Sequence, residues 1–152
     1  MSECGRWLGA VALVLGGCEH EPIDARPEVV VEELIERMQR VHDDPKAARA
    51  AYDLLWSEAK QDLAERAKRA SAVTGRQVGP EEMIAPSRFA LRFPPRHYSA
   101  VVQGDWATVT ITGEVPATQR VTLRCAREDG GWRVVLELPP LSPIQSRSDA
   151  GI

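Results

Sequence analysis

Residues 96–114, RHYSAVVQGDWATVTITGE, and residues 118–138, TQRVTLRCAREDGGWRVVLEL, decide the fold of this chain. In both stretches apolar and polar residues alternate with a period of two, the spacing of a half-buried β-strand. A two-residue turn interrupts each stretch, Gly104-Asp105 in the first and Asp129-Gly130 in the second. Because such pairs favour tight turns, the pattern predicts two β-hairpins, with strands over 96–103, 106–114, 118–127 and 131–138.

The turns also predict the register of the strands. Counting outward from the first turn places Tyr98, Ala100 and Val102 opposite Ile111, Val109 and Ala107. Counting outward from the second places Cys125, Leu123 and Val121 opposite Val134, Leu136 and Leu138. Each hairpin thereby acquires one apolar and one polar face, which is typical of an antiparallel sheet covered by helices on one side.

Helices are predicted ahead of the hairpins. An apolar stripe with helical spacing runs from Pro27, which suits a first helical turn, to about residue 42. Asp44-Pro45 then begins a second stripe that ends near Gly75, as one long helix or as two broken near Ser57. The predicted fold class is α+β. N-terminal helices pack on one face of a curved, four-stranded antiparallel meander, in a single domain over 28–138.

Composition and charge narrow the function classes. The chain has 152 residues, 43% of them hydrophobic and 27% charged, which suits one globular domain with a modest core. The net charge is -3, and basic residues are interleaved with acidic ones along the chain. Because nucleic-acid binders carry a basic stripe or patch, the pattern argues against a nucleic-acid partner.

The N-terminus predicts an anchor. An apolar run over 7–15 is too short to span a bilayer but suits a secretory signal. It ends in Leu15-Gly16-Gly17-Cys18, which resembles the lipobox of bacterial lipoprotein precursors. That resemblance implies cleavage before Cys18, lipid on its thiol, and residence in the cell envelope. Residue 19 is Glu, not the Asp that resembles an inner-membrane retention signal, so we expect the outer membrane, facing the periplasm.

The remaining ends follow from this anchor. Residues 1–17 are the predicted signal peptide, and 18–27, with two prolines, are the lipidated cysteine and an extended tether. Residues 139–152 are predicted to be a disordered tail. Cys4 is removed with the signal peptide and the Cys18 thiol carries the lipid, so Cys125 has the only free thiol and the mature domain has no internal disulfide. Its place among apolar strand residues predicts a buried, unreactive thiol.

The mature domain resembles the nuclear-transport-factor-2-like superfamily in three short segments. They are AYDLL at 51–55, the Gly104-Asp105-Trp106 turn, and the closing GGWRV at 130–134. The resemblance implies a curved sheet wrapped around helices, a cystatin-like cone with a pocket. It implies no single function, because the superfamily includes isomerases, dehydratases, binding proteins and dimerisation scaffolds.

Few residues offer chemistry for a site. Tyr52 and Tyr98 are the candidate pocket hydroxyls, but neither has a partnered carboxylate, so no catalytic residue is predicted. No metal or cofactor site is predicted either.

The candidate interaction surface is the polar sheet face, with Trp106 as its anchor beside Thr108 and Thr110. The alternative is that the 86–95 segment, with Phe89 and Phe93, covers Trp106. Trp132 is expected to stack with Arg127 at the rim of the sheet.

Three functions follow from these observations. The first is a lipid-anchored envelope protein that binds a protein partner or a small ligand without catalysis. The second is a structural or assembly subunit of an envelope complex, which dimerises through the sheet face. The third is a small enzyme working in the cone pocket.

Overall fold

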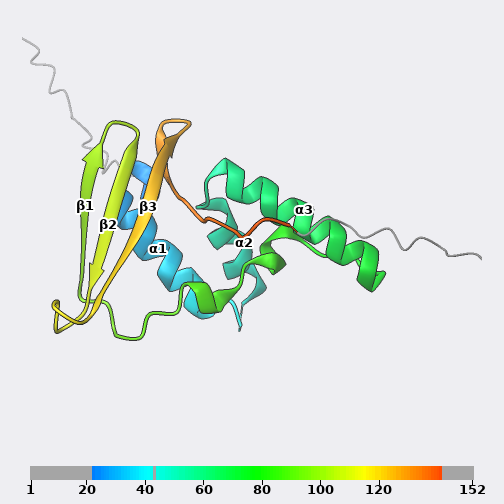
Figure 1. Ribbon diagram of the computed structural model, residues 1–152, viewed down its shortest axis with the longest axis horizontal. Helices are drawn as coiled ribbons and strands as arrows, with labels where there is room; N and C mark the ends of the chain where they lie inside the picture. Colours follow the sequence, from blue (N-terminus) through cyan, green and yellow to red (C-terminus); the bar gives the residue numbers. More distant parts are fainter. Residues whose placement is uncertain (1–21, 43, 142–152) are drawn as a thin grey trace, which may run out of the picture.

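The computed structural model describes residues 22–42 and 44–141, and its sheet follows chain order. The strands are β1 (His97–Gln103), β2 (Trp106–Thr112), β3 (Arg120–Glu128) and β4 (Gly131–Val134). All neighbours are antiparallel, so the α+β fold and the four-stranded meander are confirmed. The sheet is open, with β1 at one edge (Figure 1).

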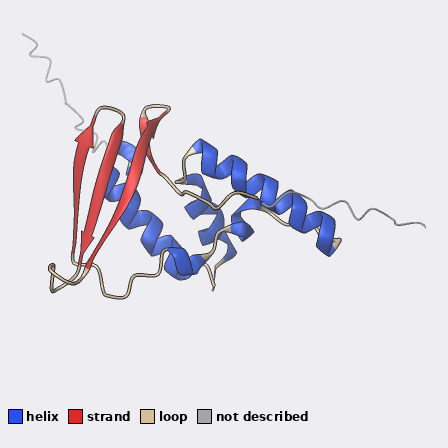
Figure 2. Ribbon diagram, viewed as in Figure 1, coloured by secondary structure: helices blue, strands red, loops and turns tan. Residues whose placement is uncertain are grey.

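Three α-helices accompany the sheet: α1 (Pro27–Arg40), α2 (Pro45–Asp53) and α3 (Ser57–Thr74). α1 crosses behind the sheet and contacts it, while the sheet face in view carries no helix (Figure 2). α2 and α3 lie beyond the β3–β4 side (Figure 1). The predicted one-sided cover of the sheet is therefore formed by α1.

The first hairpin has the predicted register throughout. Tyr98, Ala100 and Val102 pair with Ile111, Val109 and Ala107. Gly104 has a φ of 61°, as a turn with glycine in its first central position requires. In the second turn Asp129 and Gly130 both have positive φ, 51° and 81°, which matches a type I′ turn. Local turn chemistry was thus sufficient to place both turns.

The second hairpin is shorter than predicted. Cys125 pairs with Val134, but β4 ends there, and the predicted pairs of Leu136 and Leu138 with β3 are absent. Val134 instead bonds on its other side to the α2–α3 connection: its N–H donates to the Leu54 carbonyl (2.9 Å), and its carbonyl accepts from the Trp56 N–H (3.1 Å). Beyond Val135 the chain leaves the sheet, and Leu136 and Leu138 pack against the core. An alternating pattern shows that a residue is half-buried but not which neighbour buries it.

The same contact separates α2 from α3. The backbone groups of Leu54 and Trp56 bond to Val134 in a short parallel bridge, so the helical stripe is broken over 54–56. At the other ends, Asp44 caps α2 by accepting from the Lys46 N–H (2.9 Å), and Gly75, with a φ of 72°, ends α3. Of the two open alternatives, two helices are the correct one.

The core lies between α1 and the sheet, and continues under α2 and α3. Six residues of α1 are buried: Pro27, Val30, Val31, Leu34, Ile35 and Met38. Across from them, Val109, Ile111 and Cys125 have no exposed surface. Trp132 does stack with Arg127, the guanidinium 4.8 Å from the ring centroid, but it is only 2% exposed. Its predicted position at the rim was therefore wrong: it points to the apolar side and is a core residue.

Both ends of the domain differ from the predicted tether and tail. Ile23–Ala25 form a 3₁₀ turn (η1) packed on α1 and β4, and Asp24 forms an ion pair with Arg133 (2.6 Å). The Pro139 carbonyl accepts from Arg66 of α3. The described parts of the tether and tail are thus bound to the domain. Cys18, the lipobox and residues 142–152 lie outside the described residues. No helix within 22–42 or 44–141 is long and apolar enough to cross a membrane.

Candidate functional site

The two tyrosines predicted to share a pocket lie in different places. Tyr52 is on α2, where its hydroxyl donates to the Lys60 carbonyl (3.4 Å), and Arg49 lies 5.3 Å from its ring centroid. Desolvation by burial raises the pKa of the Tyr52 phenol. Tyr98 is on β1 and faces α1 across an open groove. The structure does not bring the two hydroxyls together, so they form no common pocket.

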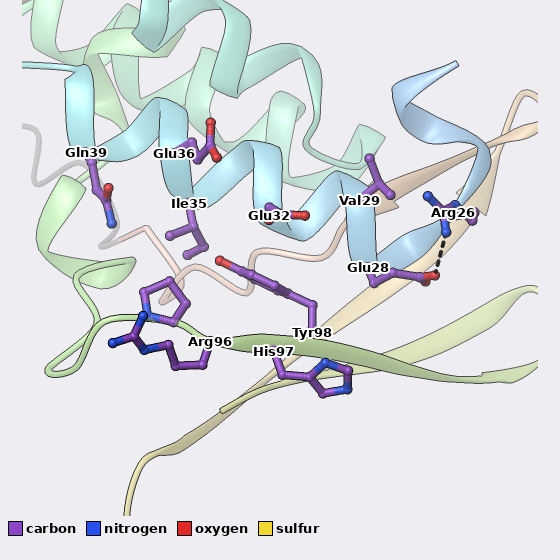
Figure 3. Close-up of a pocket in the computed structure, with 11 residues that line it drawn as sticks. Arg26, Glu28, Val29, Glu32, Ile35, Glu36, Gln39, Arg96, His97 and Tyr98 are labelled. Carbon is purple, nitrogen blue, oxygen red and sulfur yellow. Dashed lines mark ion pairs between the residues drawn. The ribbon is translucent and has the colours of Figure 1, made fainter. Parts of the chain in front are cut away.

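The groove between α1 and the start of β1 has a volume of about 510 Å³. Figure 3 shows Tyr98 reaching from β1 toward α1, while the ring of His97, its neighbour on β1, points in the opposite direction. The lining residues of α1 and its N-terminal flank are Arg26, Glu28, Val29, Glu32, Ile35, Glu36 and Gln39, and those of β1 and its flank are Pro95, Arg96, His97 and Tyr98. Most of these side chains are polar, so the groove can recognise a charged or hydrogen-bonding ligand.

Three glutamates form a row along the α1 wall of the groove. Glu28, Glu32 and Glu36 are spaced four residues apart, so they share one helix face at intervals of about 6 Å. Glu28 is half-buried, whereas Glu32 and Glu36 are exposed. These three residues line the α1 wall of the groove, and we call them the acidic row. The Glu28 side chain is directed toward Arg26, and that of Glu36 is directed away from β1 (Figure 3).

Basic residues lie at the ends of this row. Arg26 is 3.7 Å from Glu28, and Arg40 is 3.0 Å from Glu36 (the first pair is dashed in Figure 3). Within the described part of the chain, Glu32 has no ion-pair partner closer than 4 Å. Arg96, which lines the groove from the β1 side, is 3.8 Å from Glu114, so Glu32 is the carboxylate of the row that has no ion-pair partner among the described residues.

Tyr98 lies across the groove from the acidic row. Burial, followed by the nearby carboxylates of Glu32 and Glu36, raises the pKa of the Tyr98 phenol to about 12. The phenol therefore keeps its proton at neutral pH and can act as a hydrogen-bond donor or as an aromatic surface. A raised phenol pKa suits binding rather than acid–base catalysis near neutral pH, where a useful catalytic pKa lies closer to 7.

β1, the other wall of the groove, is an edge strand of the sheet. Among the described strands it pairs only with β2. Natural proteins protect such edges with proline, charged residues or bulges, yet His97–Gln103 contains no proline, lysine, arginine or carboxylate. Two of its valines are exposed, Val101 by 63% and Val102 by 51%. The groove therefore combines an acidic row with backbone available for pairing, a combination that the sequence analysis missed.

Trp106 lies exposed on the outer sheet face, as predicted, but it also contacts two side chains that were not predicted. The residue is 43% exposed, and its ring meets that of Trp56 edge to face, with centroids 6.1 Å apart. Arg124 stacks on it, 4.8 Å from the ring centroid. The 86–95 segment is not its cover: Phe89 is in the core, and Phe93 lies against Gly113, past the opposite end of β2.

The two threonines predicted beside Trp106 follow it on β2. Thr108 is exposed and Thr110 is half-buried. Their strand partners on β1 are Val101 and Ser99, which share the outer face. The outer face thus presents a small apolar patch around Val101 and Trp106 within a polar surface.

Cys125 is buried, as predicted. Burial, with a smaller contribution from Glu28, raises the pKa of its thiol to about 12. A neutral thiol is a poor nucleophile, so Cys125 packs in the core and has no place in a site. Among the described residues there is also no group of three His, Cys, Asp or Glu side chains that could hold a metal ion.

Comparisons with known proteins add no family to this description. No protein-family model matches the chain, and neither the curated proteins nor the solved structures contain a match.

Proposed function

We propose that this chain is a lipid-anchored protein of the bacterial envelope, attached through Cys18, that binds a partner without catalysis. The observation that carries the proposal is the groove between α1 and β1. It is open, it is lined by polar side chains, and one of its walls is a sheet edge. Binding sites are usually concave, and the polar groups in them fix the orientation of what they bind.

The anchor would hold this groove close to the membrane. Asp24 is six residue steps after Cys18, so the two are at most about 20 Å apart. Asp24 is held to β4 by Arg133, and α1, which carries the acidic row, begins three residues after it. A partner would therefore be captured near the bilayer surface, in the periplasm if the anchor is in the outer membrane.

The anchor has its own test, metabolic labelling of the chain with a fatty acid in a bacterial host. The wild-type chain is expected to take up label and to fractionate with the outer membrane. Cys18→Ala is expected to take up none and to accumulate as precursor. Release of an unlabelled wild-type chain into the periplasm would contradict the anchor.

The binding function is tested by photocrosslinking in cells. A photoreactive phenylalanine analogue replaces Gln39, which lines the groove, or the exposed Asp62 of α3 as the matched control. The Gln39 position is expected to give a discrete adduct heavier than the chain, which the Asp62 position does not give. Adducts from both positions alike, or from neither, would refute the groove as the binding site.

A second function, assembly through the outer sheet face, is favoured by the exposed patch around Val101 and Trp106. It predicts concentration-dependent dimers of the chain in sedimentation, weakened by Val101→Thr. A monomer over the whole concentration range would exclude it.

A further inference from the structure

We propose that the groove binds an extended basic segment of a partner protein, which adds to the sheet as a fifth strand beside β1 and points alternate Lys or Arg side chains at the acidic row. This proposal rests on the proposed binding function and names the chemistry of the partner.

The backbone part of the argument comes from the sheet edge. β1 is seven residues long and, among the described strands, has a neighbour on one side only. A strand edge presents N–H and C=O groups to any extended chain that reaches it, and peptide recognition by strand addition uses such edges. β1 itself contains no proline, lysine, arginine or carboxylate, the residues that protect many sheet edges from such pairing.

The side-chain part of the argument comes from matching repeats. Successive carboxylates of the acidic row are about 6 Å apart along α1. Side chains on one face of a strand repeat every two residues, or about 6.6 Å. α1 and the start of β1 line the same groove (Figure 3), so the part of an added strand that pairs with the start of β1 passes the acidic row. Its inward-facing residues therefore meet Glu28, Glu32 and Glu36 nearly in step.

The charges select a basic partner over a second copy of this chain. In a symmetric dimer paired edge to edge through β1, the twofold axis would place the acidic row of each protomer toward that of the other. Like charges brought together in this way oppose association. An incoming strand with alternate Lys or Arg residues meets opposite charges, and its intervening side chains lie beside the exposed Val101 on the outer face.

The probe is a fluorescein-labelled peptide of four Thr-Lys repeats, titrated with the full-length chain in detergent micelles and followed by fluorescence anisotropy. It is expected to bind about tenfold or more tightly than a peptide of four Thr-Glu repeats, and to weaken as salt screens the charges. A peptide of the same composition with its four lysines contiguous is expected to bind more weakly, because its charges are out of step with the acidic row.

Two further changes separate strand pairing from simple charge attraction. Glu32→Gln with Glu36→Gln is expected to weaken binding about fivefold, as two exposed ion pairs would, while Glu58→Gln with Asp62→Asn on α3 leaves it unchanged. Methylating one alternate set of peptide amides, the set that faces β1, is expected to abolish binding, whereas methylating the other set is tolerated.

Several outcomes would overturn the proposal. They are equal binding of the Lys and Glu peptides, an unchanged affinity in the Glu32/Glu36 variant with intact circular dichroism, or indifference to both sets of methyl groups. Equally tight binding of spermine would also overturn it, since a free polyamine cannot pair with a strand. If Gln39 crosslinks to a partner but the Thr-Lys peptide does not bind, the proposed binding function stands and the proposed strand addition is refuted. If Gln39 gives no adduct, the proposed binding function is refuted, whatever the result with the peptide.

Discussion

The burial of Cys125 predicts a specific loss of stability in alkaline solution. The thiol is completely inaccessible, and burial raises its pKa from an ordinary value of 9.0 to about 12. The fold therefore favours the neutral thiol over the thiolate. Its contribution to the free energy of unfolding is fully present below pH 9, and is progressively lost as the pH rises from 9 toward 12, because only the unfolded chain ionises there.

The magnitude follows from that difference. A pH of about 10.5 is about 1.5 units above the pKa of the thiol in the unfolded chain, whereas the thiol in the folded chain remains protonated. Ionisation of the unfolded chain therefore destabilises the fold by about 2 kcal/mol. Cys125→Ala removes this dependence but also removes a small buried group, which costs about 1 kcal/mol at neutral pH. The variant is therefore expected to be less stable than the wild-type chain at about pH 7.5 and more stable at about pH 10.5.

The assay is urea denaturation of the full-length chain followed by tryptophan fluorescence, at both pH values and with reductant present. Val109→Ala serves as the matched control, because it removes a buried apolar group without removing a titrating one. Its stability should fall with pH in parallel with the wild-type chain, even though other groups titrate in this range. Parallel pH curves for Cys125→Ala and the wild-type chain, or rapid reaction of the native thiol with a thiol reagent, would refute the reasoning.

Two further predictions concern contacts made by the α2–α3 connection. Trp106→Ala should destabilise the fold by about 2 kcal/mol, and a double-mutant cycle with Trp56→Ala should give a coupling of about 1 kcal/mol, because the two rings meet edge to face; additive effects in urea melts would contradict the contact. Glu128→Ala should cost about 1 kcal/mol, because its carboxylate caps α3 from β3 by accepting from the Ser57 N–H (3.0 Å) and hydroxyl (2.8 Å); its effect should largely vanish in a Ser57→Pro background, where both donors are absent.

The hairpins were predictable because their determinants are local. The Gly104-Asp105 and Asp129-Gly130 turns specify the connections, and the period of two then assigns each residue to a face. Helix caps behave in the same way: Asp44 and Gly75 act on backbone groups within a few residues of themselves. The predicted burial of Cys125 followed from register alone.

The candidate site was less predictable than the fold. Tyr98 was identified, but its supposed companion Tyr52 lies on another surface. The acidic row can be found in the sequence as three glutamates four residues apart, a spacing that is equally typical of a solvated helix face. The row becomes part of a candidate site because α1 lies beside the edge of β1, and no local sequence pattern predicts that position.

By itself the sequence determined which segments form strands and helices, where the hairpins turn, and which strand faces are apolar, because these depend on neighbours a few residues away. Only the tertiary structure decided what covers those faces. Val134 bonds to Leu54 and Trp56, Trp106 meets Trp56, and Leu136 and Leu138 leave the sheet for the core. The contacts of Val134 and of Trp106 with residues 54–56 join parts of the chain that are 50 or more residues apart. Apolar burial is non-directional, so an alternating pattern predicts that a side chain is buried but not which residues bury it. The packing of the whole chain determines those neighbours.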